Sequence, residues 1–241
     1  MDAGVLAIPL PRLALAFVPA LATLVLLARW SLDVRDASLA VARMLIQLLA
    51  IGFVLAYIFE AERPAIVLCV LTVMLLAAGL IALRPFREKS PASFAMALAA
   101  IATGGVTTLV LVTAGVLQLT PWYMPRYLIP LAGMIFANAM NAVSLAGERF
   151  ESERAAGTTS EAARRAALRA ALIPITNSLV AVGLVSLPGM MTGQILSGVS
   201  PLIAARYQIM VMCMVYGSAG LSAGCYLTLA SRERAGEPAA G

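Results

Sequence analysis

The segment 128-LIPLAGMIFANAMNAVSLAGERF-150 decides the fold of this chain. It carries no charged side chain until Glu148, and most of the residues before that point are apolar. About 20 consecutive, mostly apolar residues are the length that an α-helix needs to cross the hydrocarbon core of a bilayer. The segment therefore predicts a membrane-spanning helix that ends where its charges begin.

The rest of the chain has the same character. Of its 241 residues, 61% are hydrophobic and only 12% are charged, whereas a soluble domain is about 25% charged. We expect an all-α, polytopic transmembrane bundle that forms one domain over residues 1–230, followed by a short polar tail at 231–241. The first apolar segment resembles the apolar region of a signal peptide, but the acidic start MDAG favours its retention. Seven segments are long and apolar enough to span a membrane: 13–29, 37–59, 64–84, 92–118, 126–146, 171–197 and 202–230.

The basic residues predict the orientation of the chain. If successive loops alternate between the two sides, thirteen of the 17 Lys and Arg residues fall on one side, which is then cytoplasmic. This places the N-terminus outside and the C-terminus, with its tail, in the cytoplasm. The one long loop, 147–170, is cytoplasmic too. Thr158, Thr159 or Ser160 could cap a short helix that lies along the membrane surface there. The loop is either a solvated basic connector or a docking surface for a cytoplasmic partner.

Several kinds of chemistry are missing from the sequence. There is no histidine, the three cysteines are far apart, and every Asp and Glu lies outside the predicted spans or at their ends. Proton- and ion-coupled transporters usually keep an ionisable residue inside the membrane, so secondary transport is disfavoured, as are intramembrane proteases and metal hydrolases. No phosphate-binding loop of the GxxxxGK[ST] type occurs. If ATP drives this protein, another polypeptide binds it, and we expect no enzymatic activity, bound cofactor or nucleic-acid partner for this chain.

The polar chemistry that remains is neutral. Amide and thioether side chains interrupt the apolar segments, and Pro188 and Gly189 break the predicted span 171–197. Asn in a membrane helix often only forms interhelical hydrogen bonds, and Met often only fills gaps in the packing. A proline can simply kink a helix and so shape its packing. The alternative is a substrate path with a hinge or gate at Pro188 and Gly189, since transporters use broken helices in this way. The path residues on this hypothesis are Asn138, Asn141, Asn177, Met190, Met191 and Gln194, and weak candidates for metal contact are Met134, Met210, Cys213 and Met214.

Two stretches carry a resemblance to a known family. They are 170-AALIPITNSLVAVGLVSLPGMMTGQILSGVSPLIAARYQIMVM-212 and the segment 128–150 quoted above. Both resemble the signatures of the iron-export ABC transporter permeases of the FetB type, whose plant relatives are linked to aluminium tolerance. The resemblance covers most of the chain.

The resemblance implies a permease subunit in a bacterial inner membrane, paired with a cytoplasmic ABC ATPase that binds ATP and Mg, and exporting iron or giving broader metal and oxidative-stress resistance. We expect a homodimer of this chain. The loop 147–170 is then the coupling element: Gly157 and Pro174 resemble the glycine and proline of EAA-type loops, and Glu161, Arg164 and Arg165 would face the ATPase. Two alternatives remain, namely an ABC permease for a nucleotide-sugar or another small organic solute, and a membrane scaffold without transport activity.

Overall fold

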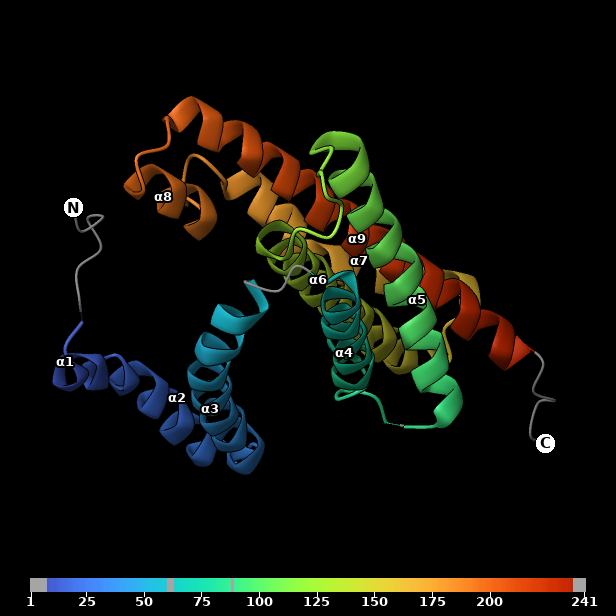
Figure 1. Ribbon diagram of the computed structural model, residues 1–241. Helices are drawn as coiled ribbons and strands as arrows, with labels where there is room; N and C mark the ends of the chain where they lie inside the picture. The colour runs from blue at the N-terminus through green and yellow to red at the C-terminus, as the bar shows by residue number, and fades with distance from the viewer. Residues whose placement is uncertain (1–7, 60–62, 88, 236–241) are drawn as a thin grey trace. The chain divides into compact units, whose positions relative to one another are not determined.

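A computed structural model describes residues 8–59, 63–87 and 89–235. The chain forms two compact units that meet in sequence at Ala61 and Glu62. The first unit contains α1 (Leu10–Leu15), α2 (Phe17–Arg29) and α3 (Val34–Phe59) (Figure 1). The Asp33 carboxylate accepts a hydrogen bond of 3.0 Å from the Asp36 backbone N–H and so caps the first turn of α3.

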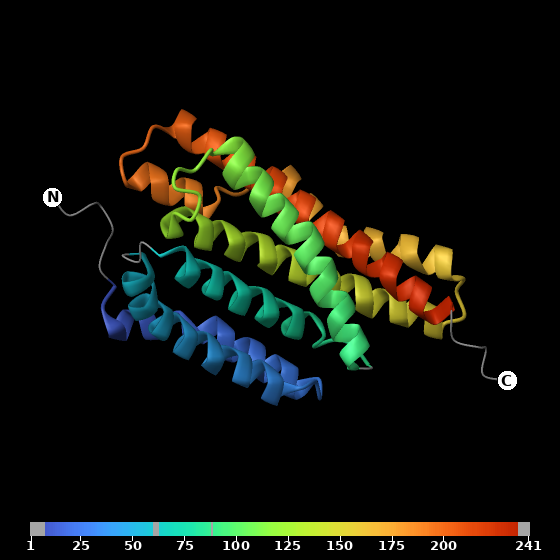
Figure 2. The ribbon, with the colours of Figure 1, turned by 45° about the vertical axis from the view of Figure 1, so that its right-hand side comes forward.

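The second unit is a bundle of the remaining helices. Four of them begin with a proline in the first turn, a position where the missing N–H costs nothing. Two helices form the centre of the bundle: α9 lies against α5, α6, α7 and α8, and α6 lies against α4, α5, α7 and α9 (Figures 1 and 2). The helices are α4 (Pro64–Ala82), α5 (Pro91–Val110) with its π-helical continuation η1 (Leu111–Val116), α6 (Pro125–Ala155), α7 (Ser160–Ala181), α8 (Gly189–Leu196) and α9 (Pro201–Ala235).

Small residues allow α5 and α9 to approach closely. A methyl group added at Gly104 would lie 2.4 Å from the Ser222 Oγ and 2.7 Å from the Ser222 backbone nitrogen. Ser218, one turn earlier on α9, is fully buried at the same crossing. The two backbones are therefore nearly in contact, as in membrane helix pairs that rely on small residues rather than on hydrophobicity.

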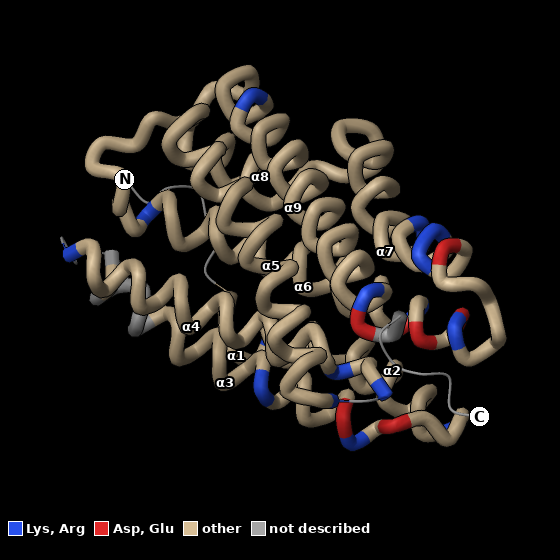
Figure 3. The backbone as a smooth tube through the Cα atoms, turned by 90° about the vertical axis from the view of Figure 1, so that its right-hand side faces the viewer, with Lys and Arg blue, Asp and Glu red and all other residues tan. Residues whose placement is uncertain are grey.

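The second unit has a charged end, which we define as residues 82–87, 89–91, 147–169 and 226–235. Three contacts hold these segments together. The Arg87 backbone N–H donates to Glu151 Oε2 (3.1 Å), the Phe86 and Tyr226 ring centroids lie 5.5 Å apart, and the Phe86 ring fills the space beside Gly147. Figure 3 shows Lys, Arg, Asp and Glu gathered on the α6–α7 turn and the neighbouring helix ends. In this unit the basic residues away from the charged end are Arg63, Arg126 and Arg206.

The predicted helical, polytopic membrane architecture is confirmed. Among the described residues, five helices are long and apolar enough to cross a bilayer, namely Leu10–Arg29, Pro64–Ala82, Pro91–Val116, Pro125–Ala155 and Pro201–Glu233. At 1.5 Å per residue, the 19 residues of α4 span about 28 Å, close to the hydrocarbon thickness. The 31 residues of α6 and the 35 of α9 reach about 46 and 52 Å, so both extend past the membrane at the charged end. The number of spans and the side of each terminus stay predictions.

Three sequence-based boundaries are wrong. The predicted span 171–197 is not one helix, because α7 ends at Ala181 and α8 starts at Gly189. The predicted surface helix within 147–170 is not separate: α6 runs to Ala155 and α7 begins at Ser160, so a short turn joins two long helices. The predicted polar tail begins as helix, since α9 continues to Ala235. The rest of that tail, 236–241, and the MDAG start lie outside the described residues.

Candidate functional site

The turn between α6 and α7 is built from local backbone chemistry. Gly157 has a φ of +84°, the left-handed conformation that glycine adopts without a Cβ penalty. Its N–H donates to the Arg154 carbonyl (3.0 Å), and the Thr158 N–H donates to the Glu153 carbonyl (3.1 Å). This pair of bonds is the Schellman motif that closes a helix C-terminus. Gly157 thus ends α6, whatever else it does.

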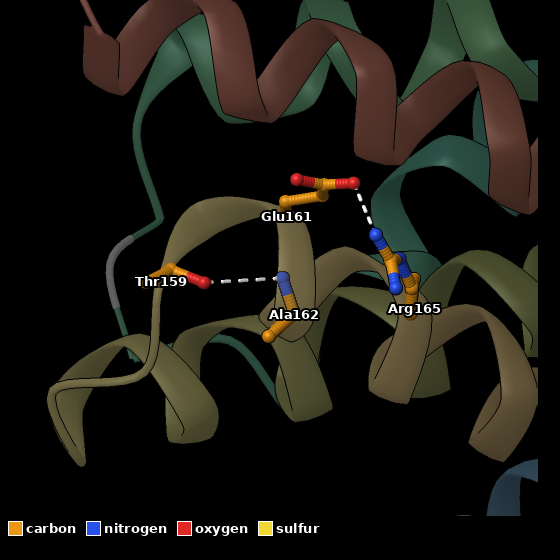
Figure 4. A network of polar contacts seen from close by, with 4 residues as sticks. All are labelled: Thr159, Glu161, Ala162 and Arg165. Atoms are coloured by element: carbon orange, nitrogen blue, oxygen red, sulfur yellow. Dashed lines mark hydrogen bonds and ion pairs between the residues drawn. The ribbon is translucent and has the colours of Figure 1, made fainter.

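The next residues start α7 at once. Thr159, one of the three predicted caps, accepts a hydrogen bond of 3.4 Å from the Ala162 N–H through its Oγ1 (Figure 4). Glu161 forms an ion pair with Arg165 one turn further on, also drawn in Figure 4. The hydrogen bond from Arg165 lowers the pKa of the Glu161 carboxyl, and the charges of Arg165 and Arg164 act in the same direction. The carboxylate also lies at the positive end of the α7 dipole.

A hollow of about 270 Å³ lies between the first turns of α7 and the last turns of α9. Charged side chains of α7 and apolar or small residues of both helices line it: Glu161, Arg164, Arg165, Leu168, Gly224, Leu227 and Thr228. Three of the five predicted coupling residues therefore gather at one place, and Gly157 lies in the adjoining turn. Pro174 is apart from them, in the middle of α7, where it removes the N–H that would have bonded the Ala170 carbonyl. This hollow and the charges around it can receive a protein segment of complementary charge.

The break between α7 and α8 is a compact loop at residues 182–188. Gly183 has a φ of +83°, and its N–H donates to the Ser186 carbonyl (2.9 Å). The Ala181 carbonyl accepts from three N–H groups, those of Leu184, Val185 and Ser186. Pro188 precedes α8 in an extended conformation as its N-cap residue, and its carbonyl accepts from Thr192 Oγ1 at 3.2 Å. Pro188 and Gly189 therefore begin a helix rather than kink one, which corrects their place in the fold.

The predicted path residues lie on three helices. On α6, the Asn138 Nδ2 donates to the Met134 carbonyl (2.8 Å), so this amide is partly satisfied by its own helix, while Asn141 is exposed. Asn177 is exposed near the end of α7. Met190, Met191 and Gln194 are half-buried on α8, which packs on α9. Helix α6 packs against α7, whereas α8 packs on α9, so the candidates on α8 form a separate group. Their role as a path stays a prediction.

The four weak candidates for metal contact do not all face one site. Met214 is buried, whereas Cys213 is exposed, so these two neighbours on α9 do not face one site. Met134 and Met210 are half-buried on α6 and α9. Within the described part of the chain, no three His, Cys, Asp or Glu residues come together in a group that could hold a metal ion.

Sequence reasoning missed Gln208. Its side chain is only 6% exposed, and its Oε1 has no hydrogen-bond partner among the described residues. The Gln194 Oε1 on α8 is buried and unpartnered as well. A buried polar atom without a partner costs about 1–3 kcal/mol, so such atoms need an explanation. The signal was present in the sequence as a single amide in the apolar run 207-YQIMVMCMV-215.

The surroundings of Gln208 are consistent with a functional position. It lies on the buried stripe of α9 together with Ala204 and Val211. At the end of α5 that lies away from the charged end, the helix continues into the π-helical turn η1, which packs mainly against α5. Single-turn π-helices inside α-helices occur frequently at functional sites. Two unpartnered amide oxygens on the α8–α9 pair could accept hydrogen bonds from a passing solute or contact a cation.

Comparison with known proteins identifies relatives over most of the chain. The model of a family described as "Uncharacterised protein family (UPF0014)" matches residues 10–159 and 154–234. "UPF0014 membrane protein slr1647" of Synechocystis is 39% identical over 72% of this chain and 73% of its own. "Probable iron export permease protein FetB" of Escherichia coli is 37% identical over 80% of each chain. "Protein ALUMINUM SENSITIVE 3" of Arabidopsis thaliana is 34% identical over 76% of this chain and 71% of its own. No solved structure matches.

Proposed function

Because the chain belongs to the UPF0014 family of membrane proteins, we propose that it is the permease subunit of an ABC transporter that exports iron or a related metal ion. The observation that carries this proposal is the likeness to the E. coli protein described as an iron export permease, which extends over 80% of both chains. The bundle supports it, since apolar helices lead to one charged end and, within the described part of the chain, the buried polar side chains are neutral. ATP and Mg are bound by a separate cytoplasmic subunit on this proposal, and the membrane is the bacterial inner membrane.

Within the charged end, the ATPase docks at the α6–α7 turn and at the hollow between α7 and α9. The α6–α7 turn is fixed by the Gly157 and Thr159 motifs, so a push on it moves two long helices rather than a loose loop. The hollow between α7 and α9 offers an apolar floor beside Arg164 and Arg165, which suits a segment with an apolar residue next to an acidic one. Movement of α7 would reach the 182–188 loop directly, and that loop and α8 are the proposed gate.

A charge reversal tests the docking. Arg164→Glu together with Arg165→Glu should abolish co-purification of the ATPase subunit while leaving the permease folded, because Arg165 is exposed and Arg164 is only half-buried at the hollow. Arg206→Glu is the matched control, since it reverses a charge at the opposite end of the same bundle. Equal recovery of the ATPase with both variants would contradict docking at this hollow.

The permease acts as a homodimer. Leu184 and Val185 in the 182–188 loop are 90% and 85% exposed, and the backbone there is not helical. Irregular backbone within a membrane is tolerated only where protein or a water-filled cavity surrounds it, so a second copy is expected beside this loop. In a chain whose native cysteines Cys69, Cys213 and Cys225 are replaced by serine, Val185→Cys should form a cross-linked dimer in membranes. In the same background, Ile209→Cys tests a second exposed face, on α9. If Val185→Cys stays monomeric under conditions that cross-link Ile209→Cys, the loop is not the dimer contact.

A small organic solute such as a nucleotide-sugar is the second candidate cargo. The neutral amides of Asn141, Asn177 and Gln194 favour it, as does the lack of a metal-holding group among the described residues. The two cargoes separate in one assay, the ATPase activity of the permease–ATPase complex in nanodiscs titrated with ferrous iron and with nucleotide-sugars. Stimulation by iron supports a metal path with transient contacts, and stimulation by the organic solute alone would replace iron as the cargo. A complex that never forms would favour a membrane scaffold.

A further inference from the structure

A second hollow of about 350 Å³ lies at the charged end, between the end of α4 and the start of α5. Its lining has two kinds of residue. Arg84, Lys89 and Ser90 supply a basic and polar rim, and Leu80, Leu83, Pro91 and Phe94 supply an apolar floor. The proposed docking and transport roles use none of these residues. We propose that this hollow binds an anionic phospholipid, with its phosphate at Arg84 and Lys89 and an acyl chain along α4.

The depth of the hollow fits a lipid headgroup. Helix α4 spans about 28 Å, which is nearly the full hydrocarbon thickness, and it ends at Ala82. Arg84 and Lys89 follow directly, so they lie at the level where phospholipid phosphates lie. A water-soluble anion would not need an apolar floor, whereas Leu80 and Phe94 offer one immediately on the membrane side of the basic rim.

The outer face of α4 continues the apolar floor into the membrane. Leu80, Leu76 and Val73 lie on one face at helical spacing, and they are 61%, 41% and 61% exposed. This stripe gives an acyl chain a continuous path away from the basic rim. Basic pockets between transmembrane helices on the cytoplasmic side are a recognised setting for anionic headgroups. The basic rim and the apolar stripe beside it together favour an anionic phospholipid over a protein segment.

The local fold holds the basic rim in place. Ser90 caps α5 by accepting from the Ser93 N–H at 3.0 Å, and the Arg87 N–H bonds to Glu151 on α6. Phe86 is 3% exposed and anchors the same connection between α6 and α9. Arg87 and Ser90, next to the basic rim, are therefore each held by a hydrogen bond. A lipid bound there would join α4 and α5 to the base of α6, next to the surface where the ATPase is proposed to dock.

Native mass spectrometry and thermal unfolding test the proposal on the full chain. The purified protein is mixed with phosphatidylglycerol or with phosphatidylcholine. Phosphatidylglycerol should stay bound and raise the unfolding temperature more. Lys89→Gln should weaken that binding about fivefold, the effect of about one charge near a membrane surface. Lys89 is the cleaner variant because Arg84 also interacts within the chain. Arg206→Gln is the control and should leave lipid selectivity unchanged.

A second variant separates the lipid from a free anion. Leu80→Gln removes part of the apolar floor without touching the charges, and its exposure makes unfolding by this change unexpected. It should weaken phosphatidylglycerol binding while soluble glycerol phosphate has no effect on any variant. Unchanged phosphatidylglycerol selectivity in both Lys89→Gln and Leu80→Gln would overturn the proposal. So would equal stabilisation by glycerol phosphate, which would make the hollow a simple anion site.

Discussion

Replacing Gly104 by alanine tests the α5–α9 crossing on which the bundle depends. The new methyl group would lie 2.4 Å from the Ser222 Oγ and 2.7 Å from the Ser222 backbone nitrogen. Non-bonded carbon contacts are favourable at about 3.5–4.0 Å, so α5 and α9 must separate by roughly 1 Å. Overpacking of this kind costs about 1–3 kcal/mol in free energy of unfolding. Alanine's better helix propensity offsets less than about 1 kcal/mol of it.

The contact partner makes the prediction sharper. Ser222→Ala removes the hydroxyl but not the backbone nitrogen, so the double variant Gly104→Ala with Ser222→Ala should recover only part of the lost stability. Gly217→Ala, on the same helix α9 as Ser222, is the matched control. A methyl group added at Gly217 would have no neighbouring atom within 4 Å. It should leave stability unchanged or raise it by up to about 1 kcal/mol.

The assay is reversible unfolding in mixed detergent and SDS micelles, followed by circular dichroism. Three outcomes would refute the reasoning. Gly104→Ala could be as stable as the parent, Gly217→Ala could be equally damaging, or Ser222→Ala could restore Gly104→Ala completely. The last result would mean that the helices meet through side chains and not through their backbones.

Three further predictions follow from single residues. Gln208→Met should raise the free energy of unfolding by about 1–3 kcal/mol, since it removes an unpartnered buried amide. The same variant should lower iron transport. A variant that transports iron as well as the parent would show that Gln208 is not part of the path. Gly157→Ala should destabilise the chain by about 1–2 kcal/mol, because Gly157 has a φ of +84°. Gly157→Asn should be less destabilising, and thermal unfolding measures both variants. The lowered pKa of Glu161 means that its ion pair with Arg165 stabilises the folded state above the ordinary carboxyl pKa of about 4.3. That contribution disappears as the pH falls through the lowered value, so the unfolding temperatures of the parent and Glu161→Gln should differ at neutral pH and converge in acid.

The sequence predicts the helix starts of the bundle well. The expected spans beginning at 64, 92, 126 and 202 start within one residue of Pro64, Pro91, Pro125 and Pro201. Proline is favoured in the first turn of a helix and disfavoured in its interior, so it marks a boundary that apolar content also indicates. The positions of the charged residues in the sequence also predict the charged end, because charged side chains are excluded from the hydrocarbon region.

The expected span 171–197 fails because apolar content alone does not distinguish a helix from an apolar loop. Gly183, Ser186 and Pro188 together permit a tight turn that hydropathy does not register. Pairing between distant segments is also invisible in one sequence: nothing marks Gly104 as the partner of Ser222. Gln208 is visible as an amide, but its lack of a partner becomes apparent only when the surrounding helices are placed.

ATP-dependent movement of iron is the most direct test of the central claim. The permease and its ATPase would be reconstituted in proteoliposomes with the ATPase outside, and uptake of radiolabelled ferrous iron into the lumen measured with and without ATP. We predict uptake that requires ATP, falls with Gln208→Met, and is abolished by the Arg164→Glu, Arg165→Glu double variant. Iron uptake that is the same with and without ATP in a complex that hydrolyses ATP would contradict the account.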